Sequence, residues 1–188
     1  MRNIKLLGVA AIAIAALTAS VGAGSAPAAE LYSTGVTVNA GTTIYASLDI
    51  PADGAILTTT DGLTIVDTCN ESEFEGTVNG YFGGDVAITI SSLEWGGCKY
   101  TTDTLTKGFL TINSSGTVKG NGSVVTVNIG VTCRYGTGTG TTLATLSTAK
   151  LSIVAVINEQ EPKQFLCPDT TKWIAGYVIS SPHDLTVK

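Results

Sequence analysis

Residues 83–90 read Gly83-Gly84-Asp85-Val86-Ala87-Ile88-Thr89-Ile90, a glycine pair followed by a run in which large apolar side chains occupy every second position. This period of two is that of a β-strand with one buried face. Glycine pairs tolerate the positive φ angles of hairpin turns, so the stretch predicts a turn that leads into a strand. Similar short runs, rich in β-branched residues, occur at 36–38, 44–48, 63–66, 109–112, 124–129, 151–157 and 173–179.

These runs predict an all-β fold. They are bounded by Gly, Asn, Asp, Ser or Pro, and pairs such as Asn79-Gly80 and Asn121-Gly122 are expected to form further hairpin turns. No stretch after residue 28 shows a capped apolar stripe of helical period. About eight to eleven short strands at this spacing are typical of an antiparallel β-sandwich, Ig-like or jelly-roll-like, or of a partly closed barrel. Both architectures stay open.

The N-terminal residues have the composition of a secretory signal peptide. A basic start at 1–5 is followed by an uncharged Ala-rich run at 6–24 and by Ala26-Pro27-Ala28, an A-x-A cleavage site. We therefore expect 1–28 to be a signal peptide and 29–188 to form a single β domain, secreted or held in the cell envelope. The alternative is a membrane anchor, because the apolar run approaches the ~20 residues that span a bilayer. No later segment is long and apolar enough for a transmembrane helix.

Four cysteines remain after the predicted cleavage: Cys69, Cys98, Cys133 and Cys167. In an exported protein an even number of cysteines indicates disulfides rather than metal ligands, and no C-x-x-C pair is present. We expect the pairs Cys69–Cys98 and Cys133–Cys167, because each brackets strand-turn-strand material that brings its ends together. The crossed pairing, Cys69 with Cys133 and Cys98 with Cys167, is the main alternative.

Composition and motifs argue against several functions. The formal net charge of −5 argues against binding to nucleic acid or anionic membranes. Residues 136–142 are rich in Gly and Thr but lack the lysine of a P-loop, so no cofactor is expected. The only histidine, His183, lies in a polar turn beside Asp184, and no G-x-S-x-G elbow exists. We expect no catalytic residues, and therefore no enzyme.

An acidic stretch is the one candidate for metal binding. Asp67, Glu71, Glu73 and Glu75 carry carboxylates of the kind that bind Ca²⁺. Their spacing is not that of an EF-hand loop, so we expect solvated charges and no metal site.

Aromatic side chains are the candidates for ligand binding. Tyr81 and Phe82 lie in a Gly-rich turn, and Trp95 precedes Gly96-Gly97, where exposed rings could stack on a sugar. Trp173 has the same-face spacing of a strand with Ala175 and Tyr177, so it is expected in the core.

Several short patterns give the chain a resemblance. They are Thr68-Cys69, residues 90–98 ending in Trp95-x-Gly97-Cys98, residues 133–143 beginning Cys133-x-Tyr135-Gly136, and residues 165–187 with Phe165-Leu166-Cys167-Pro168. Residues 60–188 thereby resemble a group of small secreted bacterial proteins that have two Cys pairs and no assigned activity. A looser similarity, in Thr/Gly-rich strands and paired Cys, is to bacterial secreted proteins named as activators of alkane oxidation. The resemblance implies export, β architecture and paired cysteines.

Two classes of function remain. The first is a non-enzymatic secreted or cell-envelope protein with a structural, adhesive or assembly role, for which self-association or a cell-surface partner is expected. The alternative is an extracellular binding module for a glycan or an apolar compound. A binding module needs a concave site with a few aromatic and polar groups. An assembly protein needs a free edge strand or a self-complementary patch.

Overall fold

The computed structural model describes residues 28–49 and 54–188, in which all regular structure is β-strand. The predicted signal peptide lies, except for Ala28, outside the described residues. The strands, in chain order, are β1 (Leu31–Ser33), β2 (Val36–Thr37), β3 (Thr43–Leu48), β4 (Ala55–Thr59), β5 (Ile65–Phe82), β6 (Asp85–Cys98), β7 (Thr101–Thr106), β8 (Phe109–Ile112), β9 (Thr117–Asn121), β10 (Val124–Asn128), β11 (Thr132–Gly136), β12 (Thr141–Ser147), β13 (Lys150–Glu159), β14 (Thr170–Ser181) and β15 (Thr186–Val187).

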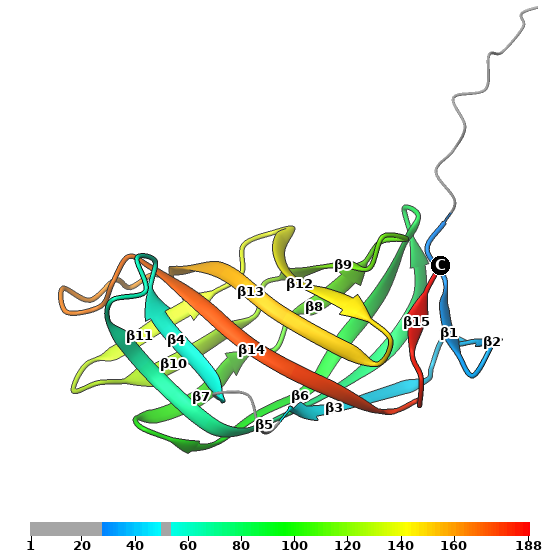
Figure 1. Cartoon of the computed structure of the whole chain (residues 1–188). Helices are drawn as coiled ribbons and strands as arrows, with labels where there is room; N and C mark the ends of the chain where they lie inside the picture. Colours follow the sequence, from blue (N-terminus) through cyan, green and yellow to red (C-terminus); the bar gives the residue numbers. More distant parts are fainter. Residues whose placement is uncertain (1–27, 50–53) are drawn as a thin grey trace, which may run out of the picture.

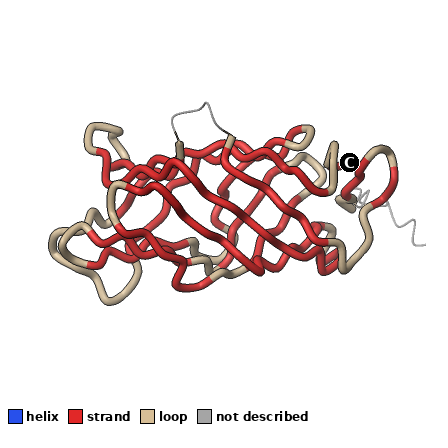
Figure 2. Tube along the Cα trace, turned by 90° about the horizontal axis from the view of Figure 1, so that it is seen from below, coloured by secondary structure: helices blue, strands red, loops and turns tan. Residues whose placement is uncertain are grey.

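The long strands close into an antiparallel barrel (Figures 1 and 2). β5 and β6 form a long hairpin, β13 and β14 form a second one, and β12 pairs with β13. β3 and β4 both pair with β14 on one side and with β5 on the other. This double pairing closes the sheet, so that the described strands occupy eight positions around the barrel.

Four of these positions are filled by two short strands in succession. β3 and β4 share the position between β14 and β5, and β9 pairs with β8 and β12 while β10 pairs with β7 and β11. β7 and β8 together run beside β6, where Ile90 N donates to Gly108 O and Thr104 Oγ1 donates to Leu93 O. Where one short strand ends and the next begins, the barrel wall can bend while both strands stay paired with the strands on either side.

The inner faces of the strands form the core. In β13 the side chains of Ile153, Ala155 and Ile157 are buried, and Val154 and Val156 between them are exposed. The three-stranded sheet β15-β1-β2 lies at one end of the barrel, with Leu31 and Leu185 fully or almost fully buried (Figure 1). At the opposite end lie the connections β4–β5, β6–β7, β10–β11 and β13–β14.

The expected all-β antiparallel fold is confirmed. Of the two architectures left open, the strands form a closed barrel and not two stacked sheets, because β14 returns to pair with the β3 and β4 segments at the start of the meander. Both expected disulfides are confirmed as well: Cys69–Cys98 joins β5 to β6, and Cys133–Cys167 joins β11 to the β13–β14 loop.

Candidate functional site

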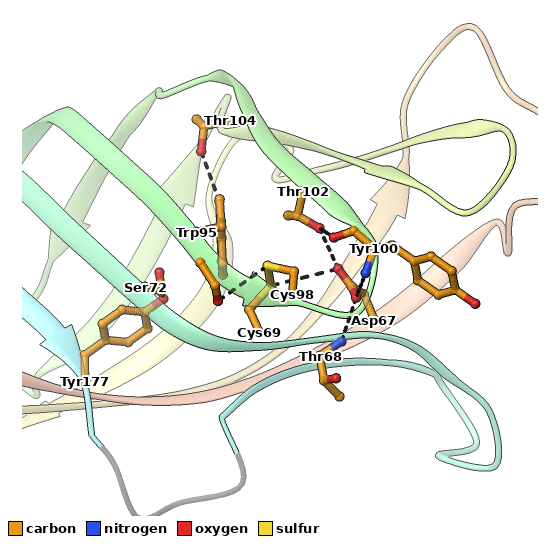
Figure 3. The surroundings of a disulfide bond; sticks show 11 residues. Asp67, Thr68, Cys69, Ser72, Trp95, Cys98, Tyr100, Thr102, Thr104 and Tyr177 are labelled. Carbon is orange, nitrogen blue, oxygen red and sulfur yellow. Dashed lines mark hydrogen bonds between the residues drawn. A yellow bond between two sulfur atoms is a disulfide. The ribbon is translucent and has the colours of Figure 1, made fainter.

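Trp95, a predicted ligand residue, packs against the core and is partly buried. Its ring lies 5.7 Å from that of Trp173 on β14, with the two planes at 59°. The indole Nε1 of Trp95 donates to Thr104 Oγ1 at 3.1 Å (Figure 3). Trp173 is partly buried against the core, in line with the expected inward position. Trp95 is therefore held by packing and a hydrogen bond, and ligand binding by its ring stays a prediction.

The other predicted ligand residues lie far from Trp95 along the same hairpin. Tyr81 pairs with Val86 next to the β5–β6 turn, and Phe82 ends β5 there, whereas Trp95 pairs with Ser72. Tyr81 is about half exposed, at 49%. The barrel therefore does not bring the three aromatics together, and ligand binding by Tyr81 and Phe82 stays a prediction.

A buried carboxylate organises the strand ends beside the first disulfide. Asp67, 3% exposed, accepts hydrogen bonds from Thr68 N at 2.8 Å, Tyr100 N at 3.0 Å and Thr102 Oγ1 at 2.5 Å (Figure 3). These bonds tie the β6–β7 turn to β5. Because the sulfur of Cys69, 3.9 Å from Oδ2, is bonded to Cys98, it carries no proton and no thiolate that could bind a metal together with Asp67.

The remaining acidic residues line the outside of the barrel. Glu71 and Glu73 on β5 lie with Glu94 of β6 along a groove of about 380 Å³, and Glu75 borders an adjoining hollow of about 350 Å³. Glu73 is directly opposite Glu94 in the ladder, an arrangement of like charges that costs stability. Asp67 is buried and does not join them, so the four predicted acids do not form one cluster.

His183 is exposed in the turn between β14 and β15. Its carbonyl oxygen accepts a hydrogen bond from Ser33 Oγ at 2.7 Å. Within residues 28–49 and 54–188, its imidazole has no hydrogen bond to a carboxylate or a serine hydroxyl, so the described structure holds no triad around it.

Sequence reasoning missed four exposed apolar side chains at the loop end of the barrel. Leu63 in the β4–β5 turn is 84% exposed, and Phe165 and Leu166 in the β13–β14 loop are 101% and 63% exposed. Ile65, at the start of β5, is half exposed. The two loops emerge side by side, because Thr59 of β4 pairs with Thr171 of β14. We call these four side chains the apolar loop tips.

The loop that carries Phe165 and Leu166 is held in place on both sides. Cys167, the next residue, is bonded to Cys133 of β11. Gln164 N donates to the buried carboxylate of Glu159 at 2.8 Å, and Lys163 Nζ lies 2.8 Å from Asp169 Oδ1. The signal in the sequence is two adjacent large apolar residues inside an otherwise polar segment.

The chain matches no family model, no curated protein and no solved structure. Of what the resemblance implied, the structure shows the two disulfide pairs and the all-β fold. The comparisons give no support for the group of small secreted bacterial proteins or for the similarity to activators of alkane oxidation. Among the described residues there is no helix of the length and apolarity that crossing a membrane requires.

Proposed function

We propose that this protein is a non-enzymatic docking protein of the cell exterior, which attaches to an uncharged apolar surface through its apolar loop tips. The observation that carries the proposal is the complete exposure of Phe165 beside the exposed Leu166 on a loop fixed by a disulfide. Large apolar side chains gathered on a surface mark an interaction site. Two disulfides and no free cysteine suit a non-reducing, extracellular environment.

Fixed loops reduce the entropy that docking costs. A loop that was mobile before binding would lose side-chain and backbone freedom on contact, whereas this one is already ordered by Cys167, Glu159 and Lys163. Burying a Phe or Leu side chain contributes roughly 1.5–3 kcal/mol, so Phe165 and Leu166 together supply enough for reversible attachment.

Charge favours a neutral partner surface. Lys163 and Asp169 neutralise one another beside the tips. The chain as a whole carries −5, which opposes binding to anionic surfaces. Attachment by strand addition has less support, because the edge strands of the described sheets are short. β2 and β15, at the two edges of the sheet β15-β1-β2, have two residues each, and β7, whose ladder pairs it with β10 alone, has six.

Retention on octyl-coated agarose, compared with uncoated agarose, tests the proposal. We expect the wild-type protein to be retained and the double variant F165S/L166S to bind at least about tenfold more weakly, from the apolar area lost. The control is V154S/I174S, which changes an exposed apolar pair on the barrel wall and should bind within about twofold of wild type.

Two outcomes would contradict the proposal. An equal loss of retention in both double variants would show non-specific adsorption. Failure of the wild-type protein to be retained would exclude an apolar surface as the partner. Light scattering during size exclusion adds a second check: a wild-type dimer that F165S/L166S converts to a monomer would mean that the tips bind a second copy of the chain.

A further inference from the structure

The barrel interior is incompletely filled. A cavity of about 50 Å³ lies toward the loop end, lined by Tyr135, Trp173 and apolar residues that include Val127 and Ile157. A second cavity of about 50 Å³ lies further along the barrel, lined among others by Phe74 and Tyr177. Protein interiors normally contain few voids larger than a water molecule.

Two residues that line the first cavity carry a polar group with no hydrogen-bond partner among residues 28–49 and 54–188. The hydroxyl of Tyr135, a residue with no exposed surface, makes no hydrogen bond, and neither does Nε1 of Trp173. Buried polar groups are nearly always paired, and an unpaired one costs roughly 1–3 kcal/mol. Their counterparts in the same barrel are paired, since Trp95 donates to Thr104 and Tyr177 donates to Ser72.

We propose that this cavity is a binding site for a small, uncharged, mainly apolar molecule that carries one hydrogen-bond acceptor. Trp173 Nε1 can only donate a hydrogen bond, and the Tyr135 hydroxyl donates readily because it stays protonated. An acceptor in the cavity would give these donors the partner that they lack among the described residues. The apolar lining holds the rest of the molecule.

The charges around the cavity select a neutral ligand. The Asp67 carboxylate lines the cavity, and its three protein donors already stabilise its charge. Glu159 pairs with Tyr135 in the ladder. No lysine or arginine is among the lining residues that the structure describes. An anion would therefore be repelled, and a cation is not needed to balance Asp67.

The two cavities share part of their lining. Trp173 lines both of them, together with Leu93, Ser123 and Thr137. A void of ~150 Å³ holds benzene, and the two cavities of about 50 Å³ each are smaller than that even when taken together. The first cavity therefore fits a molecule of only a few heavy atoms.

Tryptophan fluorescence measures this site alone, because the chain has two tryptophans and both lie here. The probes are dimethyl ether, propane and dimethylammonium, three molecules of equal size that carry an acceptor, no polar atom and a positive charge, respectively. We expect saturable spectral changes with dimethyl ether at millimolar concentration and none with dimethylammonium.

Variants test the role of the two donors. In Y135F and in W173F, the affinity for dimethyl ether relative to propane should fall about fivefold, the effect of one hydrogen bond. Y177F, which removes a hydroxyl that is already paired and that does not line the first cavity, should leave this ratio unchanged. Y135F should also be at least as stable as wild type, since the hydroxyl it removes has no partner among the described residues.

Three results would overturn the proposal. They are the lack of a saturable change with either neutral molecule, which would mean that the two donors face water only; an unchanged ratio in both Y135F and W173F; and binding of dimethylammonium more tightly than dimethyl ether. None of them depends on the apolar loop tips, so failure here leaves the docking role standing.

Discussion

Tyr177 on β14 donates a hydrogen bond of 2.8 Å to Ser72 on β5, across the inside of the barrel and 105 residues away in the chain (Figure 3). Both residues are buried. The bond lies at the end of β3, whose last residue Leu48 pairs with Tyr177, while Ser47 pairs with Glu73 next to Ser72. It joins β14 directly to β5 beside the strand that pairs with both, and so reinforces the closure of the barrel.

Stability should therefore fall at high pH. Burial raises the pKa of the Tyr177 phenol, and the hydrogen bond to Ser72 offsets part of this rise. Burial likewise raises the pKa of Tyr135, with a smaller contribution from Glu159. Below about pH 10 both phenols are protonated in the folded and unfolded chains, and their contribution is complete. Above that pH the unfolded chain releases protons that the folded chain keeps, so stability decreases by about 1.4 kcal/mol per pH unit for each phenol.

Urea unfolding at pH 8, 10 and 11 measures this decrease. Y177F should lose about 1 kcal/mol at pH 8, because its bond to Ser72 is gone, but should show a shallower decline between pH 10 and 11. S72A is the control, since it removes the same bond and keeps the phenol. A decline in Y177F as steep as in wild type would show that other groups cause the alkaline loss.

The local parts of this fold could be predicted from the sequence, and the long-range parts could not. Alternation identified the strands, and the disulfides followed because each pair brackets neighbouring strands. Asn79-Gly80 was wrongly predicted as a turn: β5 runs through it with a bulge at Gly80, and the hairpin turns at Gly83-Gly84. A turn dipeptide permits the backbone angles that a turn needs, but the pairing of β5 with β6 decides whether the chain reverses there.

Barrel closure and the interior site depend on contacts between distant residues. The pairing of β14 with β3 and β4 has no local signal, so the sequence left a sandwich and a barrel open. The approach of Trp95 and Trp173 follows from that closure. That Tyr135 has no partner could not be read from the sequence, because it depends on the neighbours its hydroxyl fails to meet.

The two disulfides should differ in what their removal does. Their residues are 29 and 34 positions apart, for which chain entropy predicts about 3.5–4 kcal/mol each. C133A/C167A also frees the loop that carries Phe165 and Leu166, so we expect weaker retention on octyl agarose while the barrel stays folded. C69A/C98A should lose similar stability and keep its retention.

Far-ultraviolet circular dichroism and urea midpoints of both variants provide the reference for folding. Loss of retention in C69A/C98A at a temperature where it is folded would contradict a specific role for the Cys133–Cys167 bond in presenting the tips.

A glycine between β7 and β8 should be intolerant of any side chain. Gly108 has a φ of +68°, and a Cβ there would lie 2.3 Å from Asn121 O and 2.6 Å from Ser123 N. G108A must therefore move backbone of the neighbouring β9–β10 position, and we expect a loss of about 3 kcal/mol or more. Gly62 is the matched control, because its φ is +75° and a Cβ there would meet no atom within 4 Å. G62A should cost only about 1–2 kcal/mol for its backbone conformation. Equal urea midpoints for the two variants would show that the backbone at Asn121 and Ser123 shifts to accept the new side chain at little cost in stability.

The last prediction concerns the Asp67 carboxylate, which is buried without a cationic partner. Its role in the described structure is to accept three hydrogen bonds, from Thr68 N, Tyr100 N and Thr102 Oγ1. D67N keeps one oxygen for the two backbone donors, and the new amide can donate to Thr102 Oγ1, whose own proton can turn to Tyr100 O at 3.4 Å. We therefore expect D67N to cost less than about 1.5 kcal/mol, the net contribution of a single hydrogen bond.

D67A instead leaves both backbone N–H groups without an acceptor and should cost about 3 kcal/mol or more. T102V removes one donor and leaves the carboxylate its other two partners, so its loss should be about 1 kcal/mol. Urea unfolding of the three variants at pH 7 distinguishes a hydrogen-bonding role from a need for charge. If D67N were as unstable as D67A, the negative charge itself would be what the β6–β7 turn requires, and the role assigned to the three donors would be wrong.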